Sequence, residues 1–144
     1  VSGKASTCFG ELRLTEDDLK SGGELAIANF LALLRLPTDL FLLDEPTTYL
    51  DLAHQLEVLQ LLDKLNQEAG RTIVMVIHDL NHAARFAHHI VAMRAGAIIK
   101  EGNADEVISS AVLQQVFQID ALVVKDPRTD KPAVISYELI APKE

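Results

Sequence analysis

The sequence predicts an α/β fold in which a mainly parallel sheet is flanked by helices. Three consecutive segments indicate it: an apolar run at residues 40–43 that leads into two carboxylates, an amphipathic stretch at residues 51–69, and a second apolar run at residues 72–77. Strand, helix and strand in this order form a parallel unit with a right-handed crossover. The chain has 144 residues, which is enough for one domain with a hydrophobic core.

The composition restricts the classes of function. Apolar residues make up 49% and charged residues 24% of the sequence, which is typical of a globular protein. The net charge of −8 argues against a nucleic-acid or anionic-membrane surface, because such surfaces need clustered Lys and Arg. The single cysteine, Cys8, permits no disulfide within the chain. No apolar stretch reaches the length of a transmembrane helix.

Residues 1–20 differ from the rest, and we expect a polar leader there, with a short helix beginning at residues 15–18. Gly3 and Lys4 resemble the end of a phosphate-binding loop. That motif needs Ser or Thr directly after the Lys and a Gly five residues before the Gly-Lys pair. Here Ala5 follows Lys4, so we do not expect a working phosphate loop at this position.

An apolar helix is predicted over residues 24–36, and its apolar residues cover nearly the whole circumference, so it should be largely buried. Ser21, Gly22 and Gly23 precede it. A helix N-terminus that follows glycines presents free backbone N–H groups to an anion. Ser21, Gly22 and Gly23 are therefore candidate phosphate contacts, although an isolated Ser-Gly-Gly is also compatible with an ordinary capped loop.

The strand at residues 40–43 leads into Asp44, Glu45 and Pro46. Pro46 cannot donate to a strand ladder, so the strand ends at Asp44. Ligands of open parallel sheets bind at the carboxyl ends of strands. Two adjacent carboxylates are costly to bury unless they meet a cation or hydrogen-bond donors. Asp44 and Glu45 therefore indicate a site that holds a cation, whereas an acidic turn without function is the simpler alternative.

The helix at residues 51–69 has leucines at three- and four-residue steps, and Gly70 is its expected C-cap. The strand at residues 72–77 is rich in β-branched residues with little alternation, which predicts that both of its faces are covered. Because the strands are parallel, His78 should reach the sheet edge that carries Asp44 and Glu45. The other four histidines match no zinc spacing, and we expect them at surface or packing positions: His54, His82, His88 and His89.

The remaining residues predict shorter elements. We expect a helix at residues 81–88, a strand at 89–93, a tight turn at Ala95 and Gly96, and a strand at 98–101. Asn103 should cap a helix that begins at Ala104, and residues 109–117 should form the next helix. Two strand-like runs, at residues 122–125 and 133–137, flank a turn at residues 126–130.

Residues 42–51, with the sequence Leu-Leu-Asp-Glu-Pro-Thr-Thr-Tyr-Leu-Asp, resemble the Walker B motif and D-loop of ABC-transporter ATPases. Residues 76–80 are similar to the switch-histidine loop of that family, and Ser21-Gly22-Gly23 has the position of its signature motif. The Thr-Thr-Tyr-Leu-Asp variant resembles the subgroup that powers import of ferric siderophores, haem and cobalamin. The resemblance implies a partial P-loop NTPase fold, with residues 21–144 as the C-terminal half of an ABC ATPase domain.

The resemblance also implies cofactors, roles and partners. ATP and Mg²⁺ are the expected cofactors: Asp44 would hold Mg²⁺, Glu45 would polarise the attacking water and His78 would sense the γ-phosphate. Asp51 would act across the interface with a second ATPase subunit, forming a homodimer. An integral membrane permease is the second expected partner, which places the protein at the cytoplasmic face of the inner membrane.

The sequence departs from the family pattern and leaves alternatives open. Lys20 stands where the family has Leu, Glu24 replaces the usual Gln, and the chain contains no complete phosphate loop. We therefore expect the isolated chain to bind ATP weakly and not to hydrolyse it usefully. A non-catalytic interaction module is one alternative. A DNA-repair ATPase is another, and the acidic charge disfavours it. The sequence does not identify the transported substrate.

Overall fold

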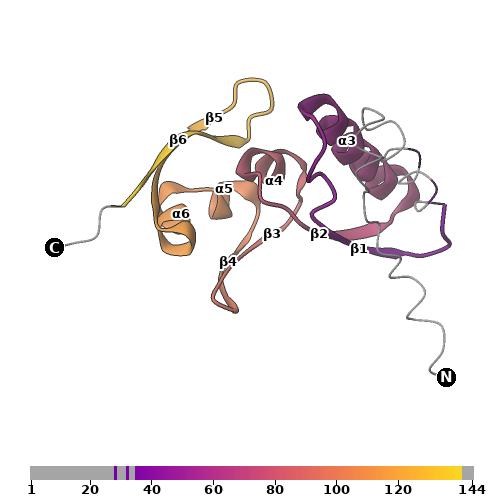
Figure 1. Ribbon diagram of the computed structural model, residues 1–144, viewed down its shortest axis with the longest axis horizontal. Helices are drawn as coiled ribbons and strands as arrows, with labels where there is room; N and C mark the ends of the chain where they lie inside the picture. The colour runs from indigo at the N-terminus through magenta and orange to yellow at the C-terminus, as the bar shows by residue number, and fades with distance from the viewer. Residues whose placement is uncertain (1–27, 29–31, 33–34, 141–144) are drawn as a thin grey trace. The chain divides into compact units, whose positions relative to one another are not determined.

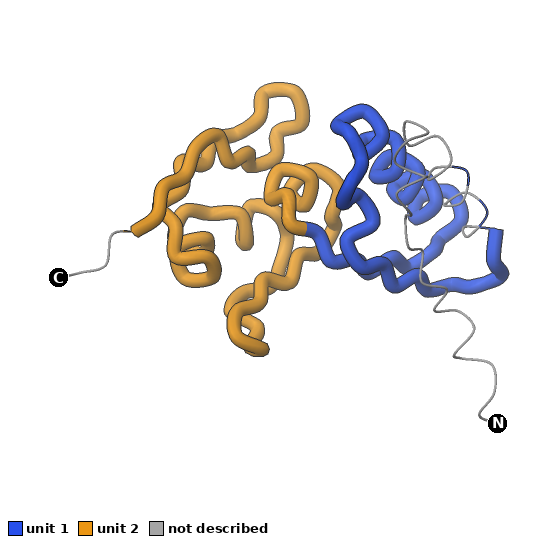
Figure 2. The backbone as a smooth tube through the Cα atoms, viewed as in Figure 1, with its two compact units in different colours: residues 1–77 blue, residues 78–144 orange. Residues whose placement is uncertain are grey.

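The structure is a computed structural model that describes Ala28, Ala32 and residues 35–140. The chain forms two compact units, Val1–Ile77 and His78–Glu144, each with its own hydrophobic core (Figure 2). Ala28 and Ala32 are helical, in agreement with the helix predicted over residues 24–36, but both are exposed, so the predicted burial is wrong at these two positions. The helix predicted at residues 15–18 lies outside the described residues.

The first unit contains two parallel strands joined by a long helix (Figure 1). β1 (Leu40–Asp44) pairs with β2 (Thr72–Val76), and α3 (Leu52–Ala69) connects them. The register opposes Asp44 to Val76, so both strands end at the same edge. This confirms the predicted strand, helix and strand. The core of this unit contains four buried residues: Phe41, Leu50, Val58 and Leu62. Five partly buried residues pack against them: Leu43, Leu61, Leu65, Ile73 and Met75.

The two faces of the β1–β2 pair differ. One face contributes Phe41 to the core, whereas the other carries four exposed apolar residues: Leu40, Leu42, Val74 and Val76, at 48%, 49%, 54% and 51% exposure. The prediction that the strand at residues 72–77 is covered on both faces is therefore wrong for the described part of the chain. Side chains alternate between the faces of a strand. α3 packs against the face that carries Phe41, through Val58 and Leu62.

α3 begins and ends through its own capping residues. The side chain of Asp51 is the N-cap and accepts from the backbone N–H of His54. Gly70 has φ 64°, in the left-handed region, and its N–H donates to the carbonyl of Asn66 at 3.1 Å. Glycine takes this conformation without the steric penalty of a Cβ. The predicted C-cap at Gly70 is confirmed.

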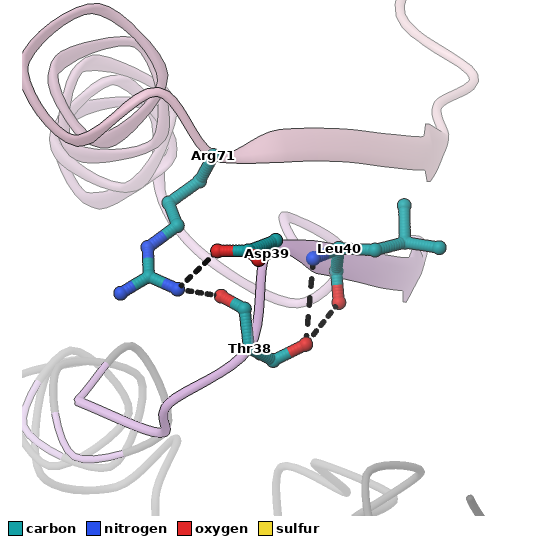
Figure 3. A network of polar contacts seen from close by, with 4 residues as sticks. All are labelled: Thr38, Asp39, Leu40 and Arg71. Carbon is teal, nitrogen blue, oxygen red and sulfur yellow. Dashed lines mark hydrogen bonds and ion pairs between the residues drawn. The ribbon is translucent and has the colours of Figure 1, made fainter.

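A polar network fixes the opposite end of the two strands, away from their carboxyl ends (Figure 3). The guanidinium of Arg71 donates to the carbonyl of Thr38 and pairs with the carboxylate of Asp39 at 3.2 Å. The backbone N–H of Thr72 donates to the carbonyl of Asp39 at 2.8 Å. The Thr38 hydroxyl bonds both backbone groups of Leu40. These contacts join the starts of β1 and β2 and thereby set the register that reaches Asp44.

The second unit begins after β2 and contains three helices and two hairpins among its described residues. The helices are α4 (Leu80–Phe86), α5 (Ala104–Val107) and α6 (Ser110–Phe117). The hairpins are antiparallel: β3 (Ile90–Arg94) with β4 (Ala97–Gly102), and β5 (Ile119–Lys125) with β6 (Pro132–Leu139). Among the described strands, β1 and β2 are thus the one parallel pair. The expected mainly parallel sheet is therefore limited to that pair.

The second unit has a core of its own, formed by residues from all three helices and from β5 and β6: Ala84, Ala104, Val107, Ile108, Leu113, Ile119, Ala121 and Val134. The amide of Asn81, on α4, bonds both backbone groups of Val134 on β6, at 3.1 Å to the carbonyl and 2.8 Å from the N–H. The side chain of Asn81 thus satisfies strand groups that another strand would otherwise pair. This contact ties α4 to β6.

Candidate functional site

Asp44 lies at the carboxyl end of β1, as the sequence predicts. It is the last residue of the strand, opposite Val76 in β2, and it is exposed. The chain turns away directly after it, and the backbone N–H of Glu45 donates to the carbonyl of Val76 at 3.1 Å. This bond keeps Glu45 beside the end of β2. The acidic pair is therefore at the sheet edge where open parallel sheets bind ligands.

Glu45 has an uncommon backbone conformation. Its φ is +48°, in the left-handed region, and it is not a glycine. Such residues cost roughly 1–3 kcal/mol and persist where surrounding contacts over-determine them. Besides the bond to Val76, the carbonyl of Glu45 accepts from the backbone N–H of Thr48 at 3.2 Å. The residue with the strained backbone at this turn is thus also the predicted catalytic carboxylate.

Asp51 closes the same turn at the start of α3. Its Oδ1 accepts from the backbone N–H of His54 at 2.9 Å and lies 2.7 Å from Nδ1 of the same residue. The backbone N–H of His54 is the main cause that holds the pKa of Asp51 below its usual range, with the imidazole contributing and partial desolvation opposing. The side chain of Asp51 is 64% exposed. The carboxylate therefore caps a helix and is also accessible from outside.

Of the four other predicted site residues, the structure describes only His78. His78 is exposed and begins the second unit, two residues after the end of β2. That it faces Asp44 and Glu45 stays a prediction. Ser21, Gly22 and Gly23 lie outside the described residues, and their role as phosphate contacts also stays a prediction.

The exposed carboxylate of Asp44 is a ligand of the kind that Mg²⁺ takes. Among residues 35–140, His, Cys, Asp and Glu side chains form no group of three or more that could hold a metal ion. Mg²⁺ keeps several waters and is usually held by one or two carboxylates together with substrate phosphates. Asp44 at an open sheet edge supplies such a carboxylate. The residues present therefore fit Mg²⁺ bound together with a nucleotide.

Two side-chain contacts of this turn were not predicted from the sequence. The Thr48 hydroxyl donates to Oε2 of Glu45 at 3.1 Å, and the Gln55 amide donates to the carbonyl of Leu50 at 2.9 Å. His54, expected at a surface or packing position, is 19% exposed and contacts the cap carboxylate of Asp51 through its ring.

Comparison with known proteins finds relatives that are similar to this chain over most of its length. The chain is 62% identical over 120 residues to the iron(3+)-hydroxamate import ATP-binding protein FhuC of Bacillus subtilis, covering 83% of this chain and 45% of that protein. It is 38% identical over 141 residues to the ferric enterobactin transport ATP-binding protein FepC of Escherichia coli, covering 96% and 52%. The chain spans about half the length of the curated relatives that it matches.

Solved structures show the same fold. A putative metal-chelate type ABC transporter in an inward-facing conformation matches with a TM-score of 0.69 and 25% identity, over 90% of this chain and 54% of that one. The ATP-binding cassette MJ0796, as a dimer bound to ADP and Pi, matches with a TM-score of 0.50 and 34% identity, over 56% and 34%. No family model matches the chain. Within the described residues, the helices are too short or too polar to cross a membrane.

Proposed function

We propose that this chain, which matches the C-terminal part of iron-import ABC ATP-binding proteins, supplies the Walker B, D-loop and switch-histidine segments of an ATPase that energises an importer. The proposed cargo is a ferric siderophore or a related iron, haem or cobalamin complex. The observation that carries the proposal is the turn at the end of β1, where Asp44 ends the strand and Glu45 leaves it in a left-handed conformation. The similarity to import proteins favours this function over a DNA-repair ATPase.

In this proposal Asp44 would hold Mg²⁺ through the water shell of the ion, and the ion would supply neutralisation of charge on the phosphate oxygens. Catalysis of phosphoryl transfer depends on positioning and on electrostatic stabilisation, because little covalent chemistry falls to the protein. Asp44 suits this role because it is exposed at the end of a strand whose register is fixed at the opposite end by Arg71.

Glu45 is the proposed general base. Its carboxylate would orient the attacking water and accept its proton, and such a role needs a carboxylate within hydrogen-bond reach of the water. The left-handed backbone and the bond to Val76 hold this residue at the ligand edge of the sheet. Glu45 follows Asp44 directly, so the base and the Mg²⁺ ligand belong to one short segment.

His78 and Asp51 have proposed roles that differ from those of Asp44 and Glu45. His78 would donate a hydrogen bond to an oxygen of the γ-phosphate, which suits an imidazole. Asp51, exposed at the start of α3, would contact a second ATPase subunit across a dimer interface. Ser21, Gly22 and Gly23 would contact the nucleotide bound by that second subunit. An integral membrane permease is the proposed second partner, and it would hold the ATPase at the cytoplasmic face of the inner membrane.

The 144-residue chain by itself should bind ATP weakly. Its Gly3-Lys4 pair lacks the rest of a phosphate loop, whose backbone N–H groups and Lys would hold the triphosphate. The proposal therefore assigns the chemistry to a longer assembly in which such a loop is present. The FhuC protein of B. subtilis provides a donor for that part, because more than half of its length is unmatched by this chain.

ATP turnover by a chimera tests the proposed function. The chimera joins the unmatched N-terminal part of FhuC to this chain, and phosphate release is measured with and without Mg²⁺. We expect Mg²⁺-dependent hydrolysis that Glu45→Gln lowers by at least about a hundredfold, since a positioned base contributes roughly 10²–10⁴. Glu57→Gln is the matched control, because Glu57 is an exposed carboxylate on α3. Equal activity of the two variants would refute the role of Glu45.

A further inference from the structure

We infer that Thr48 is a positioning residue that fixes the carboxylate of Glu45. The Thr48 hydroxyl donates to Oε2 of Glu45 at 3.1 Å, and both residues are partly buried. The inference rests on the proposed function, because it assumes that the direction of the Glu45 carboxylate matters for catalysis. A hydrogen bond from a neutral hydroxyl to a carboxylate is charge-assisted and stronger than one between two neutral groups.

The local backbone makes this contact specific. The backbone N–H of Thr48 donates to the carbonyl of Glu45 at 3.2 Å, so the two residues also face each other across the main chain of the turn. The left-handed φ of Glu45 sets the direction of its Cβ, and the β-branch of threonine restricts the χ1 angle of Thr48. The side-chain bond then limits the remaining torsions of the long Glu45 side chain.

The turn that carries Thr48 is anchored on both sides. Thr47 and Leu50 are each only 8% exposed, and the N–H of Leu50 donates to the carbonyl of Thr47 at 3.3 Å. The Gln55 amide, from the first turn of α3, donates to the carbonyl of Leu50 at 2.9 Å. Although Tyr49 is exposed, the buried and bonded Thr47 and Leu50 hold the backbone of the turn on either side of Thr48.

Two substitutions separate a positioning role from a merely structural one. Thr48→Val keeps the volume and the β-branch but removes the donor, whereas Thr48→Ser keeps the donor. Thr72→Val is the matched control, because Thr72 is an exposed threonine at the start of β2. If the hydroxyl positions Glu45, Thr48→Val should disturb the position of the Glu45 carboxylate. Thr48→Ser and the control Thr72→Val should leave that position nearly unchanged.

The first measurement uses the full 144-residue chain and does not depend on ATP. Carbon-detected NMR records the side-chain carboxyl resonance of Glu45, while amide spectra report whether the fold is intact. We expect Thr48→Val to shift this resonance clearly, and Thr48→Ser and Thr72→Val to leave it close to its original position. An unchanged resonance in a folded Thr48→Val chain would overturn the inference.

The second measurement uses the FhuC chimera and separates kcat from KM. Loss of one charge-assisted hydrogen bond should lower kcat by about tenfold in Thr48→Val with KM for ATP unchanged, and Thr48→Ser should recover most of it. The inference fails, while the proposed function stands, under three conditions together. The unsubstituted chimera hydrolyses ATP, Glu45→Gln abolishes this hydrolysis, and Thr48→Val has the same kcat as Thr48→Ser. If the chimera does not hydrolyse ATP, the proposed function fails, and the carboxyl resonance decides the inference.

Discussion

Leu62→Ala should lower the stability of the first unit and leave the stability of the second unchanged. Leu62 lies on α3, is 1% exposed and belongs to the core beneath β1 and β2. Truncating a buried leucine to alanine costs about 2–5 kcal/mol, depending on how far the surroundings collapse into the cavity. Only four buried residues form this core among the described residues, so we expect the surroundings to collapse into the cavity and a cost of about 2–3 kcal/mol.

Amide hydrogen exchange measures this loss separately in each unit. Each 1.4 kcal/mol corresponds to a tenfold change, so the slowest amides of β1 and β2 should exchange about 30- to 150-fold faster in Leu62→Ala. The N–H of Val134, bonded to Asn81 in the second unit, is the internal reference. Leu52→Ala is the matched control, because Leu52 lies on the same helix at 74% exposure. Equal effects of the two substitutions, or equal acceleration in both units, would refute the assignment of Leu62 to this core.

Two further predictions concern the ends of α3. Asp51→Asn should melt at a higher temperature than Asp51→Ala at neutral pH, since asparagine also caps helices well. The pKa of Asp51 lies below its ordinary value of 3.8, so the ionised carboxylate stabilises the fold above that pH, and this contribution is lost as the pH falls through the folded-state pKa. The melting temperature of the unsubstituted chain should therefore drop more than that of Asp51→Asn in strong acid, and an equal drop would contradict the capping role. Gly70→Ala should cost about 1 kcal/mol by hydrogen exchange of the first unit, because φ is 64° and no atom crowds the added Cβ; an unchanged rate would contradict this.

The helix ends could be predicted from sequence because neighbouring residues determine them. Gly70 ends α3, and Asn103 begins α5 with a capping box in which Glu106 returns the hydrogen bond. Both devices act within a few residues, so the pattern alone indicates them. The end of β1 at Asp44 was predictable for a similar reason, since Pro46 cannot continue a strand ladder.

Strand extent and strand burial depend on distant residues and were predicted less well. β5 begins at Ile119, three residues earlier than predicted, because its first residues pair with the end of β6, where Ile119 opposes Leu139. The exposure of Val74 and Val76 on β2 contradicts the predicted cover on both faces of that strand, because a β-branched run indicates that a strand suits a buried position but not which element covers it.

Within the candidate site, the sequence predicted which residues would carry the chemistry but not how they are held. Asp44 and Glu45 were predicted from residue type and position and Asp51 from the family resemblance, and the structure places all three between the end of β1 and the start of α3. The left-handed backbone of Glu45 and the bond from Thr48 depend on torsion angles, for which no residue pattern is diagnostic. The position of His78 relative to this turn stays a prediction.

Calorimetric titration with Mg-ATP tests most directly the claim that this chain carries half of a nucleotide site. We predict no measurable binding by the isolated chain and micromolar binding by the FhuC chimera. His78→Ala should weaken that binding, whereas His88→Ala, at an exposed histidine, should not. Micromolar binding by the isolated chain, or binding by the chimera that is indifferent to His78→Ala, would contradict this claim.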